Sequence, residues 1–306
     1  MCRLLAFILV AAAALSPCVV RAQVVSFNSA GVELYYTSAG TGTPIVLLSG
    51  GPGLTIEYML PVAQSLPSGY RSIAFEQRGT GRSRSHPFDP AALTLHGAVE
   101  DLEALRVRLQ QDRLTLLGHS WGGMLAMAYA AEHPDRVDRL ILVGSGGPTL
   151  EFEQRFGDNI EARLRPEDVE LRRHWLAAAK NGVDSAKASI ETLRAIVPGY
   201  FFDRKAGLAF ASEFKVGQLQ PDVNERLFAE MSRHYDSLDG LKNLKRPVLI
   251  IQGHQDPFGD KTAEDIRSLI AGSRLVYINR CGHFPWIEQP EAFRKAIADF
   301  LSTPPQ

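Results

Sequence analysis

The stretch GHSWGG, Gly118 to Gly123, places one serine, Ser120, among three glycines. It follows the apolar run 114–117, which is typical of a buried strand, and it precedes a helical pattern that extends to about Ala131. A strand that turns directly into a helix holds the residue at the turn in a strained backbone conformation and exposes its side chain above the sheet. In this context the G-x-S-x-G pattern predicts that Ser120 is a nucleophile and not merely a small turn residue.

The neighbours of this serine are expected to stabilise negative charge on a substrate oxygen. The first N–H groups of a helix have no partner within that helix, so the backbone N–H of Trp121 is one predicted donor. The second is expected from the loop SGGPG, residues 49–53, which follows the apolar run 44–48. Gly51 is the residue we choose there, because a residue without Cβ allows close approach of a substrate. A plain tight turn would use the same glycines.

A serine hydroxyl needs a base, and His283 is the predicted one. It lies just after the last predicted strand, in NRCGHFPWIEQP (279–290), where parallel sheets gather catalytic groups at their carboxyl edge. His254 is its rival, and His119 is expected to project to the other side of the turn. Surface or helix-end positions are expected for His86, His96, His133, His174 and His234.

The acid that orients the base is predicted in IIQGHQDPFGD, residues 250–260, which offers Asp256 and Asp260. Asp256 is nearer the end of the predicted strand, so its position is better fixed; a loop-capping role is the alternative for it. The other place for an acid, after Val143, contains no carboxylate. Ser120, Asp256 and His283 stand in the chain order serine, acid, histidine, and together they predict a triad that works through an acyl-enzyme.

Apolar, β-branched runs alternate with helical patterns along most of the chain, which predicts an α/β fold with a mostly parallel sheet covered on both faces. Strands are expected at 24–27, 32–37, 44–48, 71–75, 114–117, 137–143, 247–253 and 275–278, and helices at 94–109, 121–131, 261–270 and 290–301. Residues 147–240 are largely helical in pattern and rich in charge. We expect them to form a helical cap inserted between two core segments, 23–146 and 241–306.

Composition limits the possible partners. The chain has 306 residues, 45% hydrophobic and 22% charged, with a formal net charge of -1. Without a long basic run, a nucleic-acid partner is not expected. His254 and Asp256 would offer a metal only two ligands, which do not make a site. We therefore expect a small-molecule or short-peptide substrate and neither a metal nor a cofactor, since water and the triad suffice.

The first 22 residues have the pattern of a secretory signal peptide. Arg3 precedes the apolar run Leu4 to Leu15, and Val20-Arg21-Ala22 is an A-x-A-like cleavage site. The apolar run is short for a membrane span, so we expect a periplasmic or secreted protein without stable membrane insertion after cleavage. A retained N-terminal membrane anchor is the alternative. Cleavage would leave Cys281 as the one cysteine, so no internal disulfide is expected.

Taken together, these motifs resemble the α/β-hydrolase fold, and more closely its proline iminopeptidase-like branch, the prolyl aminopeptidases. That branch carries a HGGPG loop, a D-Q-R-G-x-G-x-S segment and a G-x-S-W-G elbow. This sequence has SGGPG at 49–53, EQRGTGRS at 76–83 and GHSWG at 118–122. The resemblance extends from about Val24 to Leu301. It departs from the family at Ser49, where the family has histidine, and at Glu76, where the family has aspartate.

The resemblance implies an exported serine hydrolase, in its most specific form an aminopeptidase of the proline iminopeptidase type that releases an N-terminal residue. A carboxylesterase or lactonase with the same triad is the alternative, and a non-catalytic binding protein of the same fold is disfavoured by the complete triad. The family holds the substrate's free amino group with cap carboxylates. Solvated helix faces explain the available cap carboxylates equally well, so these are weak candidates: Asp203, Glu213, Glu225 and Glu230.

Overall fold

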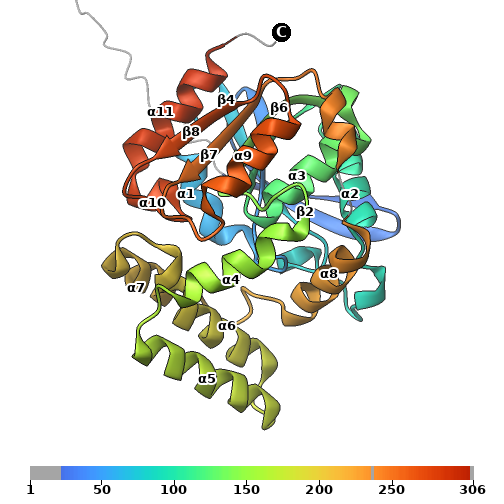
Figure 1. Cartoon of the computed structure of the whole chain (residues 1–306). Coiled ribbons are helices and arrows are strands. Elements are labelled where there is room, and N and C mark those ends of the chain that lie inside the picture. Colours follow the sequence, from blue (N-terminus) through green and yellow to red (C-terminus); the bar gives the residue numbers. More distant parts are fainter. Residues whose placement is uncertain (1–21, 236–237, 304–306) are drawn as a thin grey trace, which may run out of the picture.

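The computed structural model describes residues 22–235 and 238–303, which contain one eight-stranded sheet (Figure 1). Its strands are β1 (Gln23–Ser29), β2 (Val32–Gly40), β3 (Thr43–Leu48), β4 (Tyr70–Glu76), β5 (Leu114–His119), β6 (Val137–Val143), β7 (Val248–Gly253) and β8 (Arg274–Ile278). Their order in space is β1-β2-β4-β3-β5-β6-β7-β8. The pairs β1–β2 and β2–β4 are antiparallel, and every other neighbouring pair is parallel. The predicted mostly parallel sheet is confirmed.

The central strands are apolar along their whole length because both faces of the sheet are covered. In β6, for example, Leu140 and Leu142 join one buried cluster, whereas Ile141 and Val143 join the other. This two-residue alternation divides the core into two layers, one on each side of the sheet.

Helices from different parts of the chain cover the two faces. On one face lie α2 (Leu95–Arg108), α3 (Trp121–Glu132) and α9 (Gly259–Leu269). On the other lie α1 (Leu60–Ala63) and α11 (Pro290–Leu301). The predicted helix start at Thr94 is confirmed, because its hydroxyl accepts a hydrogen bond from the backbone N–H of Gly97.

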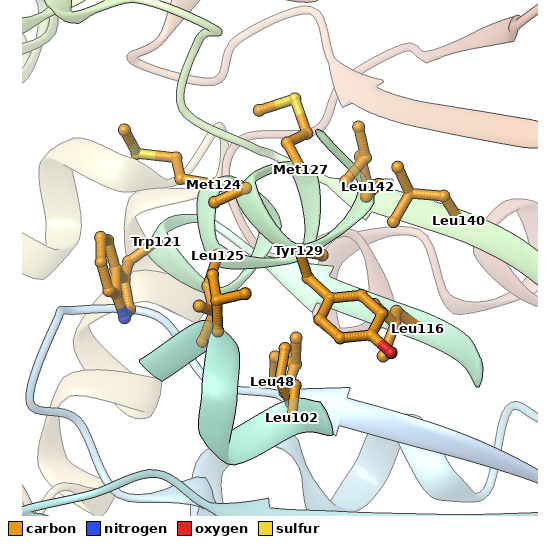
Figure 2. Close-up of a cluster of buried hydrophobic side chains, with 14 of the residues drawn as sticks. Leu48, Leu102, Leu116, Trp121, Met124, Leu125, Met127, Tyr129, Leu140 and Leu142 are labelled. Atoms are coloured by element: carbon orange, nitrogen blue, oxygen red, sulfur yellow. The ribbon is translucent and has the colours of Figure 1, made fainter. Parts of the chain in front are cut away.

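Helix α3 is buried on all sides for its first ten residues, as expected for a helix without a polar face. Figure 2 shows its side chains among leucines of three strands and of α2; the labelled neighbours are Leu48, Leu102, Leu116, Leu140 and Leu142. This packing makes α3 a fixed support for Ser120, the residue that immediately precedes it.

Five helices separate β6 from β7, and among the described residues of this segment there is no strand of the sheet. They are α4 (Glu153–Glu161), α5 (Pro166–Lys180), α6 (Ser185–Ile196), α7 (Arg204–Glu213) and α8 (Pro221–His234). Figure 1 shows them gathered at one end of the sheet, and we call them the cap. The boundaries of the cap at residues 147 and 240 stay a prediction.

Short helical turns make up several of the remaining connections. They are Ile56–Met59, Gly81–Ser83, Pro90–Ala92, Pro134–Arg136, Leu150–Phe152, Val197–Tyr200, Asp239–Asn243 and α10 (Pro285–Glu288). The predicted signal peptide lies outside the described residues except for Ala22. Within the described part of the chain, none of the helices has both the length and the apolar character that a membrane span requires.

Candidate active site

Ser120 lies at the junction of β5 and α3 with φ 57° and ψ −120°. For a residue with a Cβ, adopting this backbone conformation costs about 1–3 kcal/mol. Residues that are held in such strained conformations concentrate at functional sites. The surroundings hold the conformation in place, because the Ser120 N–H donates to the Val143 carbonyl oxygen at 3.1 Å and the helix begins directly afterwards.

The two glycines of the pattern are required by close backbone approach. A Cβ on Gly118 would lie 2.2 Å from the carbonyl oxygen of Gly122, and a Cβ on Gly122 would lie 2.2 Å from the carbonyl oxygen of Leu48. The turn is therefore compressed between the strand that precedes it and the neighbouring strand β3. This geometry explains why glycine stands two residues on either side of Ser120.

His283 and Asp256 are brought together from the loops after β8 and β7. The Nδ1 of His283 lies 2.8 Å from Oδ2 of Asp256, and both side chains are almost fully buried. A carboxylate only accepts, so Nδ1 carries the proton and Nε2 of a neutral ring is left free to accept one. The other oxygen, Oδ1, accepts the backbone N–H of Phe258 at 2.9 Å, which fixes the carboxylate.

Gly144 shows why no acid follows β6. A Cβ at this position would lie 2.7 Å from Oδ2 of Asp256 and 3.0 Å from Nδ1 of His283, and its φ is 46°. The Asp256–His283 pair therefore occupies the space above the end of β6, and only glycine fits beneath it.

The rival residues form a separate pair at the surface. His254 Nδ1 lies 3.0 Å from Oδ2 of Asp260, and both side chains are substantially exposed. The His254 ring stacks on Tyr277, with ring centroids 4.6 Å apart. The structure thus gives buried, oriented geometry to His283 and Asp256, and it places the rival histidine and the second acid candidate at the surface. The catalytic roles of Ser120, Asp256 and His283 stay predictions.

The loop 49–53 lies beside the elbow, and Gln77 connects the two. Gln77 Nε2 donates to the carbonyl oxygen of Ser49 at 2.8 Å, and its Oε1 accepts the indole N–H of Trp121 at 2.9 Å. Gly51 lines the same cavity as Ser120 and has φ 118°. Sequence reasoning assigned no role to Gln77, although it stands inside the quoted EQRGTGRS segment.

The two departures from the family pattern, Ser49 at the start of this loop and Glu76 at the end of β4, are not among the residues that line the cavity. The Ser49 hydroxyl donates to the Leu54 carbonyl oxygen at 2.8 Å, closing the loop on itself. Glu76 is buried and forms an ion pair with Arg82. Ser49 therefore supports the loop of the predicted oxyanion donor, whereas Glu76 holds the turn after β4.

The expectation for His119 is wrong. Its ring does not turn away from the site: it is buried and packs against the ring of His283, with centroids 4.4 Å apart. Its Nε2 lies 3.0 Å from the His283 carbonyl oxygen, and its Nδ1 lies 2.8 Å from the hydroxyl of Tyr58. No pattern in the sequence indicates this contact, because it depends on a loop 164 residues further along the chain.

A cavity of about 570 Å³ lies between the elbow and the cap. Ser120, His283 and Gly51 line it from the core, and apolar residues of α4, α5, α6 and α8 line it from the cap. Among the described residues at its wall, Glu153 is the only one with an acidic or permanently basic side chain, and it is exposed at the start of α4. A concave, mostly apolar space with few polar groups is typical of a small-molecule site.

The four weak carboxylate candidates are not brought to this cavity. Asp203 accepts a backbone N–H in the first turn of α7, and Glu230 is buried because it accepts the backbone N–H of Leu95 at the start of α2. Glu213 and Glu225 are exposed. Glu153, which sequence reasoning missed, is the one carboxylate among the described residues that line the cavity.

Comparisons with known proteins agree with this architecture. The model of the alpha/beta hydrolase fold family matches residues 43–290. A proline iminopeptidase of Lactobacillus helveticus is 27% identical over 285 residues, which are 89% of this chain and 95% of the relative. The solved proline iminopeptidase-related protein of Thermus thermophilus is 23% identical with a TM-score of 0.70, covering 92% of this chain and 98% of that one. An esterase from Exiguobacterium antarcticum is 22% identical with a TM-score of 0.65, covering 91% and 99%. The chain belongs to the α/β hydrolase fold family, and it is a serine hydrolase.

Proposed function

We propose that the protein hydrolyses a small carboxylic ester or amide through an acyl-enzyme on Ser120. The observation that carries this proposal is the strained backbone of Ser120 at the wall of the cavity, directly before a helix that is buried on all sides. A protein maintains such a conformation only where the surrounding structure holds it, and here the result is a hydroxyl presented to the cavity.

In the proposed reaction the Ser120 oxygen attacks the substrate carbonyl while Nε2 of His283 takes the serine proton. Asp256 stabilises the imidazolium that forms, and the N–H groups of Trp121 and Gly51 are the proposed donors to the oxyanion. His283 then gives its proton to the leaving alcohol or amine. Water then attacks the acyl-enzyme carbonyl while His283 takes its proton, and His283 returns that proton to the Ser120 oxygen as the carboxylic acid leaves.

The cavity favours a substrate whose acyl group is uncharged and apolar. Its wall is formed by side chains such as Phe156, Ile160, Leu193 and Met231, so a bare charge placed there would lose its hydration without a partner. A carboxylester with an apolar acyl group is therefore the substrate class that the geometry supports best.

An aminopeptidase is the second candidate, and the naming of the relatives as proline iminopeptidases favours it. Such an enzyme must hold a protonated amine beside the scissile carbonyl, and burying that cation unpaired costs several kcal/mol as an order of magnitude. Glu153 is the acidic side chain at the described cavity wall that could pair with it. This function therefore depends on Glu153.

Glu153→Gln separates the two candidates. In an aminopeptidase this change is expected to lower kcat/KM for aminoacyl-arylamides by about tenfold, a modest effect because the exposed carboxylate is partly screened by water. In an esterase it is expected to leave arylester cleavage within about twofold. The measurement is kcat/KM for both substrate types, with the exposed Glu151→Gln as the matched control. A parent enzyme that cleaves free-amine and N-acylated substrates equally well would exclude the aminopeptidase.

We also propose that the protein is exported. The composition of residues 1–22 supports this, because a basic start, a short apolar run and a small-residue end are the features of a cleaved leader. N-terminal sequencing of protein from an expressing bacterium is expected to begin near Gln23, in the fraction outside the cytoplasm. A mature chain that begins before Pro17 would instead favour the retained anchor.

A further inference from the structure

A chain of three hydrogen bonds runs along the wall of the cavity from the loop 49–53 to the loop that carries His283. The Gly50 N–H donates to the Tyr58 hydroxyl at 2.6 Å, this hydroxyl lies 2.8 Å from Nδ1 of His119, and Nε2 of His119 lies 3.0 Å from the His283 carbonyl oxygen. Tyr58 and His119 come from a short helical turn and from the end of β5. This series of hydrogen bonds thus joins two loops through the helical turn and the end of β5.

The position of every proton in this chain follows from donor and acceptor chemistry. A carbonyl oxygen only accepts, so Nε2 of His119 carries the proton that binds His283. In a neutral ring Nδ1 must then accept, and the Tyr58 hydroxyl is its donor, while the Tyr58 oxygen accepts from Gly50. One tautomer of His119 satisfies all three bonds.

The surroundings favour this neutral form. Burial lowers the pKa of His119 well below its usual value, and the neighbouring His283 lowers it further. Desolvation raises the pKa of the Tyr58 hydroxyl, which keeps it protonated as a donor. The His119 ring is also held by packing, with centroids 4.8 Å from Trp286 and 5.2 Å from Phe284.

We propose that His119 and Tyr58 are positioning residues that set the spacing between the loop of the predicted oxyanion donor and the loop of the predicted base. The main chain of His283 is fixed on its other side by its N–H, which donates to the Tyr200 carbonyl oxygen at 2.8 Å. Gly50 adjoins Gly51, and a Cβ on Gly50 would lie 3.0 Å both from Cβ of Ser120 and from the Tyr58 oxygen. The hydrogen-bonded chain therefore begins beside Ser120 and ends at the main chain of His283. This inference rests on the proposed function, because it assigns the spacing a catalytic purpose.

Tyr58→Phe is the smallest change that breaks the chain. It removes one oxygen, leaves Gly50 N–H and His119 Nδ1 without their partner, and keeps the ring that packs on Phe214 and Phe284. We expect kcat to fall about 10- to 100-fold with KM within about threefold, because small displacements of catalytic groups are costly, whereas the cavity wall, which includes Tyr58, keeps the aromatic ring and loses one oxygen. Tyr70→Phe is the matched control: it also loses one hydroxyl hydrogen bond, to the Leu301 carbonyl oxygen, and is expected to retain parental kcat.

A second pair of variants tests His119. His119→Gln keeps a donor that can reach the His283 carbonyl oxygen, whereas His119→Leu keeps none. We therefore expect kcat to decrease in the order parent, His119→Gln, His119→Leu. In the parent, NMR of the ring nitrogens should show His119 protonated at Nε2 only. A Tyr58→Phe enzyme with kcat within twofold of the parent, or a His119 protonated at Nδ1, would overturn the proposal.

These outcomes are separable from a failure of the proposed function. If the parent neither hydrolyses arylesters or aminoacyl-arylamides nor reacts with a fluorophosphonate at Ser120, the acyl-enzyme proposal is wrong and the catalytic purpose is lost with it. If the parent reacts at Ser120 and turns over, but the Tyr58 and His119 variants match it, only the positioning proposal is wrong.

Discussion

Ser120→Ala is expected to lower kcat by about 10⁴-fold or more while the protein stays folded, because the members of a catalytic triad act as a unit and the loss of one removes nearly the whole effect. The folded state should survive because the change removes a single oxygen atom, and no hydrogen bond from that side chain contributes to the cap of α3. Turnover of the best arylester or aminoacyl-arylamide, together with the unfolding midpoint, checks both parts.

The matched control is Ser189→Ala, since Ser189 on α6 is the other serine at the described cavity wall. This variant is expected to retain most of the parental kcat, and a fluorophosphonate should label Ser120 and leave Ser189 unmodified. Ser120→Gly is expected to be as inactive as the alanine variant but more stable than it by about 1 kcal/mol, because glycine adopts a positive φ without strain. Full activity in either Ser120 variant, or labelling at Ser189, would contradict the assignment.

The elbow could be predicted from the sequence because every cause of its shape is local. The apolar run 114–117 determines the strand, the helical pattern after Trp121 determines the helix, and the turn between them needs glycine where backbones touch. The pairing of Asp256 with His283 could also be predicted, since both follow strands of a parallel sheet and such residues meet at its carboxyl edge.

The contacts of His119 depend on tertiary structure, so the sequence around His119 does not indicate them. On a turn, the direction of a side chain is set by what packs on it, and here the packing partners come from residues 283–286 and from Tyr58. Tyr58 itself lies in a short helical turn that has neither strand nor helix periodicity in the sequence.

The substrate side of the cavity was unpredictable for a different reason. A cap helix is amphipathic, and sequence alone does not distinguish an apolar face that packs on the core from one that faces a cavity. Glu230 illustrates the difficulty, because it is a buried cap carboxylate, yet it serves the start of α2 and not a ligand. Glu153 is distinguished only by its place beside the cavity.

Asp256→Asn is expected to lower kcat by about 10⁴-fold with little change in KM, since it keeps the shape of the side chain and removes its charge. Oδ1 already accepts the Phe258 N–H, so the asparagine amide nitrogen would take the place of Oδ2 opposite Nδ1 of His283. A donor there forces the His283 proton to Nε2, the atom that has to receive the proton of Ser120.

Asp260→Asn is the matched control, because this carboxylate also contacts a histidine, but at the surface, and surface pairs contribute little. It is expected to change kcat by less than twofold. Steady-state kinetics of both variants on one substrate provide the measurement, and a larger loss for Asp260→Asn than for Asp256→Asn would transfer the acid's role to Asp260.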